Sequence, residues 1–398
     1  MRIASVLAAA VAALAITACG SGGEAASGGG SGGSKDPIKL GGWFPLTGPV
    51  AASGIPQKEG VVAAFKKVNA DGGINGRKVE FIARDNAFDP QQTIQAARQL
   101  VGSDKVAAIV GANGTATTAA AFPYVLNQAK VPIVNPYGGA ADWYDPAKPL
   151  LFGYQTLYEE QAAAIGAWAA EDGAKHIVVV RSDPAAFENV AKHVGPAAKA
   201  VNPSVQVDEV VTKFQSTDYS PIVGQVKAKQ PDAVVTILAF PEAAAYLKQA
   251  KLQGLTAPVY GYGPTGDEGL IKLAGDAANG FHAVSFTKPS LDPSPAMESY
   301  RAALKEFAPK EQPSSNSAAS FAGAMAFAEV LKTIKGDITP QSITKALSSA
   351  QTVETGMLPP LKWGKDAHLG TNQLQRVEVQ DGKFVAQGEF VAAPPLAH

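Results

Sequence analysis

Three glycines in the stretch V-Y-G-Y-G-P-T-G, residues 259–266, have the spacing G-x-G-x-x-G of a dinucleotide-binding turn. Such a site also needs an acidic residue about 20 positions further on, which holds the ribose hydroxyls. The next strand-like run, 280–288, contains no acidic residue, and the first one after it is Asp292. We therefore expect no dinucleotide here. The stretch is instead typical of a turn at the carboxyl end of a parallel strand, where open α/β sheets bind ligands.

Other residues that could do chemistry are sparse. The five histidines show no H-E-x-x-H spacing, and a single cysteine excludes any C-x-x-C pair. Neither a G-x-S-x-G elbow nor a phosphate-binding lysine loop occurs. We interpret the acidic pairs Glu159-Glu160 and Asp267-Glu268 as solvated helix starts. The sequence thus favours binding without turnover, so we expect no enzyme activity, no metal and no cofactor.

Composition limits the partners. The 398 residues include 34 basic and 35 acidic side chains, a formal net charge of −1, and 46% are hydrophobic. A nearly neutral surface does not suit nucleic acid. The length suggests two or more domains with full cores.

The amino terminus predicts export. Arg2 precedes an apolar run, 3–18, that is short for a membrane-spanning helix, and this pattern is typical of a signal peptide over residues 1–18. Cys19 follows, and a Gly/Ser-rich tether extends to residue 36. Small residues before a cysteine and a tether after it resemble the lipobox of bacterial lipoproteins, which implies that Cys19 carries a lipid on the extracytoplasmic face of the membrane. Ordinary cleavage that leaves a spare thiol is the alternative.

Strand-like and helix-like patterns alternate along the rest of the chain, and this alternation predicts an α/β fold with parallel sheets covered by helices. Asp89 and Pro90 have the types expected at the start of a helix. Near the end, helical stretches over 317–335 and 339–350 precede a hairpin, 374–379 and 384–390, around a type I′ turn signal. The expected strands before them are 38–44, 79–83, 106–110, 131–135, 177–180, 205–211, 233–238, 259–262 and 283–286.

Several longer segments carry a family resemblance: K-L-G-G-W-F-P-L-T-G-P-V-A-A-S-G, V-N-A-D-G-G-I-N-G-R-K-V-E-F-I-A-R-D, D-P-Q-Q-T-I-Q-A-A-R-Q-L-V, V-A-A-I-V-G, V-P-I-V-N-P, P-E-A-A-A-Y-L-K-Q-A-K-L-Q-G-L, L-A-G-D-A-A-N-G-F and L-P-P-L-K-W-G. Together they resemble the substrate-binding proteins of branched-chain amino-acid-type ABC importers. The resemblance implies a periplasmic-binding-protein type I fold of two doubly wound lobes joined by three hinge crossings. One lobe would hold 37–155 and 290–365, the other 156–289 and 366–398, in a monomer.

The resemblance also implies ligand-binding positions. The family holds a ligand carboxylate with backbone amides and a hydroxyl, which Thr115 supplies here. Tyr137, Gly138 and Gly139 stand where the family has a small residue and a Thr that helps to hold an ammonium group. The acidic ammonium partner is also replaced; Asp267 is the nearest substitute, and the alternative is that it simply caps the next helix. The full set of candidates is Ser53, Thr115, Tyr137, Gly138, Gly139, Phe187, Phe240, Tyr262 and Asp267.

These departures change the expected ligand. A cation without a buried partner would be desolvated at a cost of several kcal/mol, so a free α-amino acid is disfavoured. The aromatic candidates suit a ligand with a ring or an apolar body and one carboxylate or amide. Two functions stay open: a lipid-anchored subunit that delivers its ligand to an ABC permease and its ATPases, or a sensor of the same fold that signals to a receptor. An enzyme is a more distant third.

Overall fold

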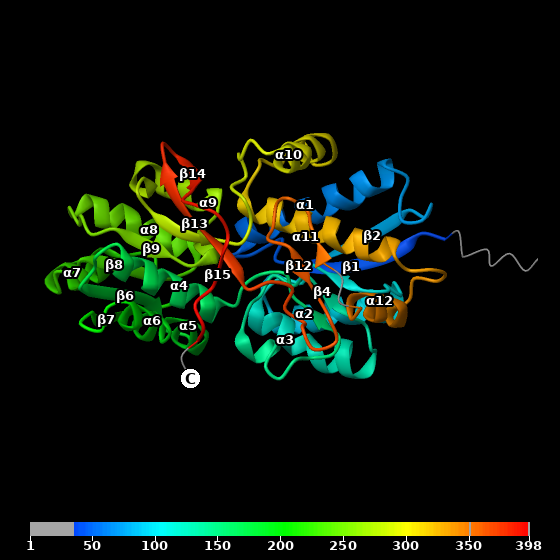
Figure 1. Ribbon diagram of the computed structural model, residues 1–398, viewed down its shortest axis with the longest axis horizontal. Helices are drawn as coiled ribbons and strands as arrows, with labels where there is room; N and C mark the ends of the chain where they lie inside the picture. Colours follow the sequence, from blue (N-terminus) through cyan, green and yellow to red (C-terminus); the bar gives the residue numbers. More distant parts are fainter. Residues whose placement is uncertain (1–35, 350–351, 397–398) are drawn as a thin grey trace, which may run out of the picture. The chain divides into compact units, whose positions relative to one another are not determined.

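The computed structural model describes residues 36–349 and 352–396 and shows a mixed α/β protein with two main sheets. The first sheet is wholly parallel, in the order β2-β1-β3-β4-β5 (Figure 1). Its strands are β1 Ile38–Phe44, β2 Val79–Asp85, β3 Ile109–Val110, β4 Ile133–Val134 and β5 Leu151–Phe152.

The second sheet has the order β14-β13-β10-β9-β8-β6-β7, and β15 also pairs with β13. Strands β6 to β10 are parallel, whereas β13 runs antiparallel to β10. Its strands are β6 His176–Ser182, β7 Gln206–Thr212, β8 Ala233–Ile237, β9 Val259–Gly261, β10 His282–Ser285, β13 Gln373–Gln380, β14 Lys383–Ala386 and β15 Val391–Ala392. A separate small pair joins β11 Thr352–Val353 to β12 Leu361–Lys362.

Helices connect the strands, as parallel neighbours require. At the start of α2, the Asp89 carboxylate accepts a hydrogen bond from the Gln92 amide at 2.8 Å and Pro90 occupies the first turn, which confirms the expected cap. The helices are α1 Ala51–Ala70, α2 Pro90–Arg98, α3 Thr115–Phe122, α4 Tyr158–Glu171, α5 Ala185–Ala191, α6 Val194–Val201, α7 Ser220–Ala228, α8 Phe240–Leu252, α9 Glu268–Ala274, α10 Pro295–Phe307, α11 Ser315–Lys332 and α12 Pro340–Leu347.

The late hairpin forms as predicted, with one correction. Strands β13 and β14 pair around Asp381 and Gly382, whose φ angles of 50° and 73° are the positive values that a type I′ turn needs. The expected strand 384–390 is not continuous, however. Gly388, with a φ of 100°, interrupts it, so β14 ends at Ala386 and β15 begins at Val391. The two-residue strand β5 was not expected, because so short a run carries no periodic pattern.

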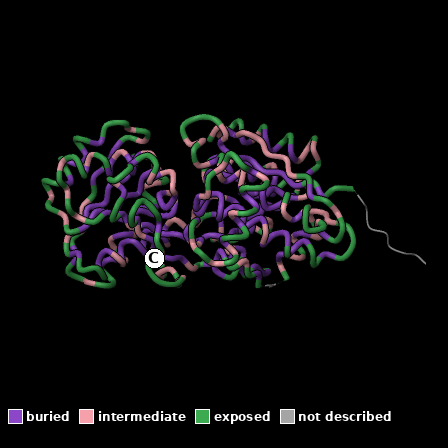
Figure 2. Tube along the Cα trace, turned by 90° about the horizontal axis from the view of Figure 1, so that it is seen from above, coloured by how far each residue is buried: buried purple, intermediate pink, exposed green. Residues whose placement is uncertain are grey.

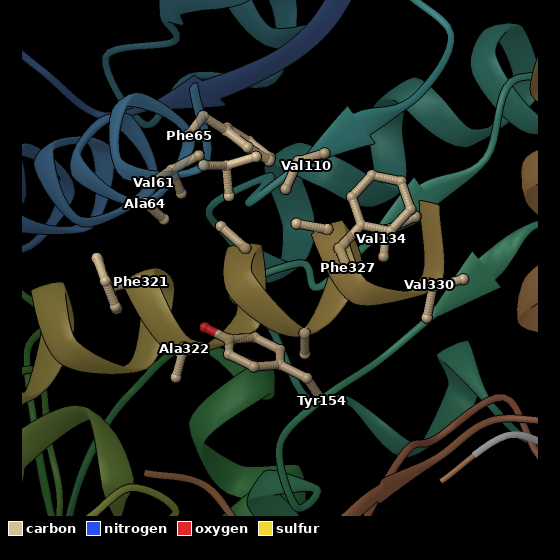
Figure 3. Close-up of a cluster of buried hydrophobic side chains, with 14 of the residues drawn as sticks. Val61, Ala64, Phe65, Val110, Val134, Tyr154, Phe321, Ala322, Phe327 and Val330 are labelled. Carbon is tan, nitrogen blue, oxygen red and sulfur yellow. The ribbon is translucent and has the colours of Figure 1, made fainter. Parts of the chain in front are cut away.

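Helices α1 and α11 form the centre of one hydrophobic core. Figure 3 shows Val61 and Phe65 of α1 close to Val110 of β3, with α11 alongside. The two helices approach so closely that a Cβ on Gly60 would lie 2.2 Å from the Ser317 carbonyl oxygen. Two further hydrophobic cores flank the second sheet. Figure 2 shows that the buried residues lie in the interior and that the exposed ones form the outer surface.

The chain passes between the two sheets three times within the described residues: after β5, after β10 and after β12. The first and third passages are joined by backbone hydrogen bonds, because the Gly153 amide donates to the His368 carbonyl at 2.8 Å and the Gly370 amide donates to the Gly153 carbonyl at 2.9 Å. Over the described ranges, no helix combines the length and the apolar character needed to span a bilayer.

Candidate functional site

A cavity of about 850 Å³ is lined by residues that follow the carboxyl ends of strands in both sheets. In the first sheet these are the segments after β1, β2, β3, β4 and β5; in the second they follow β6, β7, β8 and β9. Because ligands of open α/β sheets bind at the carboxyl ends of strands, the cavity is the candidate binding site. Its lining includes Ser53, Phe88, Asn113, Thr115, Tyr137, Asp142, Trp143, Tyr158, Glu159, Phe187, Lys192, His193, Phe214, Phe240, Tyr262, Pro264 and Asn316.

Six of the nine expected site residues line this cavity: Ser53, Thr115, Tyr137, Phe187, Phe240 and Tyr262. The turn 259–266 contributes through Tyr262 and Pro264, so the glycine-rich stretch does reach the candidate site. The backbone of this turn is held by helix α4, since the Gly263 amide donates a hydrogen bond to the Gln161 side chain at 2.8 Å. Ligand contact by these residues stays a prediction.

Gly138 and Gly139 lie in the same loop as Tyr137 but are buried behind it. A Cβ on Gly138 would lie 2.7 Å from the Trp143 ring, and one on Gly139 would lie 3.0 Å from the Gln155 amide nitrogen. Their small size therefore lets the loop pack against Trp143 and Gln155, which positions Tyr137 at the cavity.

Aromatic rings make up much of the cavity wall. Tyr158 and Tyr262 meet edge to face, with centroids 5.6 Å apart, and Phe187 and Phe214 lie 5.5 Å apart. Burial raises the pKa of Tyr158 to about 12 and that of Tyr137 well above its usual value. At neutral pH both tyrosines are therefore neutral and offer a hydroxyl group to a ligand.

Glu159 is the buried acidic group of the cavity wall. Its side chain is 8% exposed, and its Oε1 accepts a hydrogen bond from the Ala141 amide at 3.3 Å. Oε2 is buried and has no hydrogen-bond partner among the described residues. Burial raises the pKa of the Glu159 carboxyl, and the nearby Asp142 adds to the shift.

The interpretation of Glu159-Glu160 as a solvated helix start is wrong in one respect. Both residues lie in the first turn of α4, but burial raises the pKa of Glu160 to about 7. Its carboxylate accepts a hydrogen bond from the Leu157 amide at 2.9 Å and closes the start of the helix. Helix α4 is packed in the second lobe's core, which buries Glu159 and partly withdraws Glu160 from water.

In the second acidic pair, Asp267 is buried and Glu268 is half-buried, so this pair is not a solvated helix start either. Asp267 accepts hydrogen bonds from the Gly269 amide and the Asn316 amide, each at 2.8 Å. Glu268 accepts from the Ser315 amide at 2.6 Å and from the Ser290 hydroxyl at 2.5 Å. These two carboxylates at the start of α9 thus cap the first turn of α11, which packs on the other sheet. We call this contact the acidic latch.

The latch decides how Asp267 can serve a ligand. Its side chain is 3% exposed and both oxygens accept backbone hydrogen bonds, so it does not line the cavity. Asn316, one of its partners, does line the cavity and accepts a hydrogen bond from Gln57 at 3.0 Å. A direct ligand contact by Asp267 stays a prediction that requires the latch to open.

Phe88, Trp143, Tyr158, Glu159 and Phe214 were missed by the sequence reasoning. Phe88 directly follows β2, so the rule that sites form at the carboxyl ends of strands could have found it. Its φ of 57° is unusual for a bulky residue, and the Asn86 side chain holds it by accepting a hydrogen bond from its amide at 3.1 Å. Strain of this kind is common at binding sites.

Cys19, the expected lipidation site, lies outside the described residues, as do the signal peptide and nearly all of the tether.

Comparison with known proteins identifies one family, both by its family model and by the names of similar proteins. Residues 37–383 match the family model described as periplasmic binding protein. The leucine-, isoleucine-, valine-, threonine-, and alanine-binding protein of Pseudomonas aeruginosa is 28% identical over 249 residues, which is 62% of this chain and 66% of that protein, just under two thirds of its length. The Leu/Ile/Val-binding protein of Escherichia coli K12 is 26% identical over 326 residues, 81% of this chain and 86% of that protein.

Solved structures show the same fold. A branched chain amino acid ABC transporter protein from Thermus thermophilus with bound valine has a TM-score of 0.81 at 20% identity, over 90% of this chain and 97% of that one. A fatty acid ABC transporter substrate-binding protein from Thermomonospora curvata also has a TM-score of 0.81 at 20% identity, over 91% and 96%. The predicted two-lobed type I fold is thereby confirmed, and the chain belongs to the periplasmic binding protein family.

Proposed function

We propose that this protein is an extracytoplasmic solute-binding subunit of an ABC importer. It captures a small organic ligand between its two lobes and delivers it to a membrane permease driven by ATPases. The observation that carries the proposal is the cavity at the carboxyl ends of strands from both sheets. A ligand that contacts both walls favours the conformation in which they lie together, and this closure would signal that the subunit is loaded.

The named relatives support transport and leave the ligand open. The two curated relatives bind branched-chain amino acids by name, whereas one structural neighbour is named for fatty acids. A cavity of about 850 Å³ is in the upper part of the range of pockets that bury drug-sized ligands. Its aromatic lining suits a ligand with a ring or an apolar body. We therefore favour an aromatic or aliphatic carboxylate or amide.

Thr115 is the proposed carboxylate contact. It is the first residue of α3 and belongs to the cavity lining. Amide groups at the start of a helix have no partners within it, so they can accept an anion beside the Thr115 hydroxyl. This arrangement would place the acidic end of a ligand at α3 and its apolar body among the aromatic rings.

We also propose that a lipid on Cys19 anchors the protein at the outer face of the membrane. Substitution of Cys19→Ala should then release the exported protein from the membrane fraction, because no helix among residues 36–349 and 352–396 could hold it there in place of the lipid. Fractionation of cells that express either form measures this. Retention of the variant in the membrane would contradict the anchor.

The binding proposal is tested by titrating carboxylates, amides and the three branched-chain amino acids into the protein by calorimetry. We expect at least one aromatic or aliphatic carboxylate or amide to bind more tightly than leucine, isoleucine and valine. If a branched-chain amino acid binds most tightly, the ligand class is wrong and the solute-binding role stands. Uptake of the labelled ligand by cells with and without the gene separates import from sensing: a sensor would bind the ligand without changing its uptake.

A further inference from the structure

Glu159 lies where it can select the ligand, yet neither the family pattern nor the expected site included it. It belongs to the wall of the apolar cavity and is more than nine-tenths buried. One carboxylate oxygen, Oε2, is without a hydrogen-bond partner in the described part of the chain. Buried polar atoms in native proteins nearly always have partners, so an orphaned oxygen at a binding cavity needs an explanation.

The neighbouring charges do not supply that partner. Lys192 also lines the cavity and favours the ionised form of Glu159, but among the described residues no ion pair joins the two. Lys192 itself is exposed. Asp142, on the other side, is acidic and exposed and opposes ionisation. The hydrogen bond from the Ala141 amide goes to Oε1, and at 3.3 Å it is long.

Glu160 provides a comparison in the same turn of α4. Its carboxylate is also partly withdrawn from water, but it accepts the Leu157 amide at 2.9 Å and so has a structural task. The cavity lining includes Glu159 and not Glu160. The two adjacent glutamates thus differ in their hydrogen bonds: the Glu160 carboxylate accepts the Leu157 amide at the start of α4, whereas Oε2 of Glu159 has no partner among the described residues.

We propose that Glu159 is a specificity-determining residue: its side chain turns toward the cavity, and the unpartnered carboxylate oxygen, which is buried in this structure, then accepts a hydrogen bond from an N–H group of the ligand. Within the proposed ligand class, this contact favours an aromatic or apolar amide over a plain carboxylate. It also gives an amine the buried acidic partner that the expected family positions lack here. This inference rests on the proposed binding function and deepens it. Desolvation strengthens a charge-assisted hydrogen bond in an apolar wall, whereas a ligand that presents a second carboxylate to Glu159 is repelled.

The experiment uses three probes of nearly equal size: phenylacetamide, 2-phenylethylamine and phenylacetate. Each is titrated into the wild type, Glu159→Gln and the matched control Glu160→Gln. A hydrogen bond to a charged group predicts that Glu159→Gln weakens 2-phenylethylamine by about 10-fold to 100-fold. The ratio of phenylacetamide to phenylacetate affinity should also fall. Glu160→Gln, which removes the same charge one residue away, should change both by less than about threefold, because a Gln can still close the helix start.

Two results would overturn the proposal: equal affinities of the amine for the wild type and Glu159→Gln, or an equal loss in Glu160→Gln. Either result leaves the binding function standing, because the probes would still bind. If the probes bind too weakly to measure, thermal unfolding of the wild type and Glu159→Gln without ligand tests the proposal independently. A free oxygen predicts that Glu159→Gln is at least as stable as the wild type. A clear fall in its melting temperature would show a structural role for Glu159 and reject the proposal.

Discussion

Removing the Asp267 side chain should cost a large part of the stability of this fold. Asp267 accepts the Gly269 amide and the Asn316 amide at 2.8 Å each, and it is 3% exposed. Asp267→Ala leaves both amides without their partner, at about 1–3 kcal/mol for each buried donor. Burial raises the pKa of Asp267, so part of the loss is offset by removing a desolvated carboxyl group. We expect a net loss of about 2–4 kcal/mol in the free energy of unfolding.

Urea unfolding followed by circular dichroism measures this loss. Asp267→Asn keeps one acceptor oxygen and should lose about half as much. The matched control is Asp89→Asn, which changes an exposed helix cap with one hydrogen bond; Asn caps a helix about as well as Asp, so the loss should be below about 0.5 kcal/mol. If Asp267→Ala unfolds within about 0.5 kcal/mol of the wild type, the acidic latch does not stabilise the fold and the reasoning fails.

Three further predictions concern pH, packing and binding. Burial raises the pKa of Glu268 from 4.5 to about 7, so the stability that its protonated carboxyl contributes is complete below about pH 4.5 and is lost as the pH rises through 7. In urea titrations, the stability of Glu268→Gln relative to the wild type should therefore increase between about pH 5 and pH 8. A difference that stays constant with pH would contradict the shift. Gly60→Ala should lower the unfolding free energy by about 1–3 kcal/mol or more, since its Cβ would lie 2.2 Å from the Ser317 carbonyl oxygen. The control Gly224→Ala in α7 places its Cβ in open space and should raise the unfolding free energy by about 0.5–1 kcal/mol. Equal effects of the two substitutions would refute the packing argument. Thr115→Ala should weaken the best carboxylate by about 1–3 kcal/mol in calorimetry, and an unchanged affinity would remove Thr115 from the site.

The architecture was largely predictable from the sequence because each strand or helix shows its own hydrophobic pattern within a short stretch of residues. The cap at Asp89 and the turn at Asp381 and Gly382 depend on neighbours within a few residues. The parallel pairing of the early strands joins distant residues, such as Ile38 and Val79, and it was predictable only through the alternation of strands and helices. Strand β5 was missed because two residues show no period. The break at Gly388 was missed because a glycine within an apolar run can either stay in a strand or end it.

The candidate site was only partly predictable. Tyr137 and Tyr262 follow strands, so the rule for open sheets places them at the cavity. Glu159 and Asp267 lie at helix starts, where acidic residues are usually solvated, and local sequence does not reveal what covers them. Their burial depends on contacts far along the chain, such as the hydrogen bond between Asp267 and Asn316, which lie 49 positions apart.

The central claim is that a small ligand bridges the two lobes and holds them together. Small-angle X-ray scattering of the mature protein, without ligand and with the tightest ligand from the calorimetric panel at saturation, tests this claim most directly. The account predicts that an open form dominates without ligand and that the radius of gyration falls when the ligand is bound. An unchanged radius at saturating ligand would contradict it.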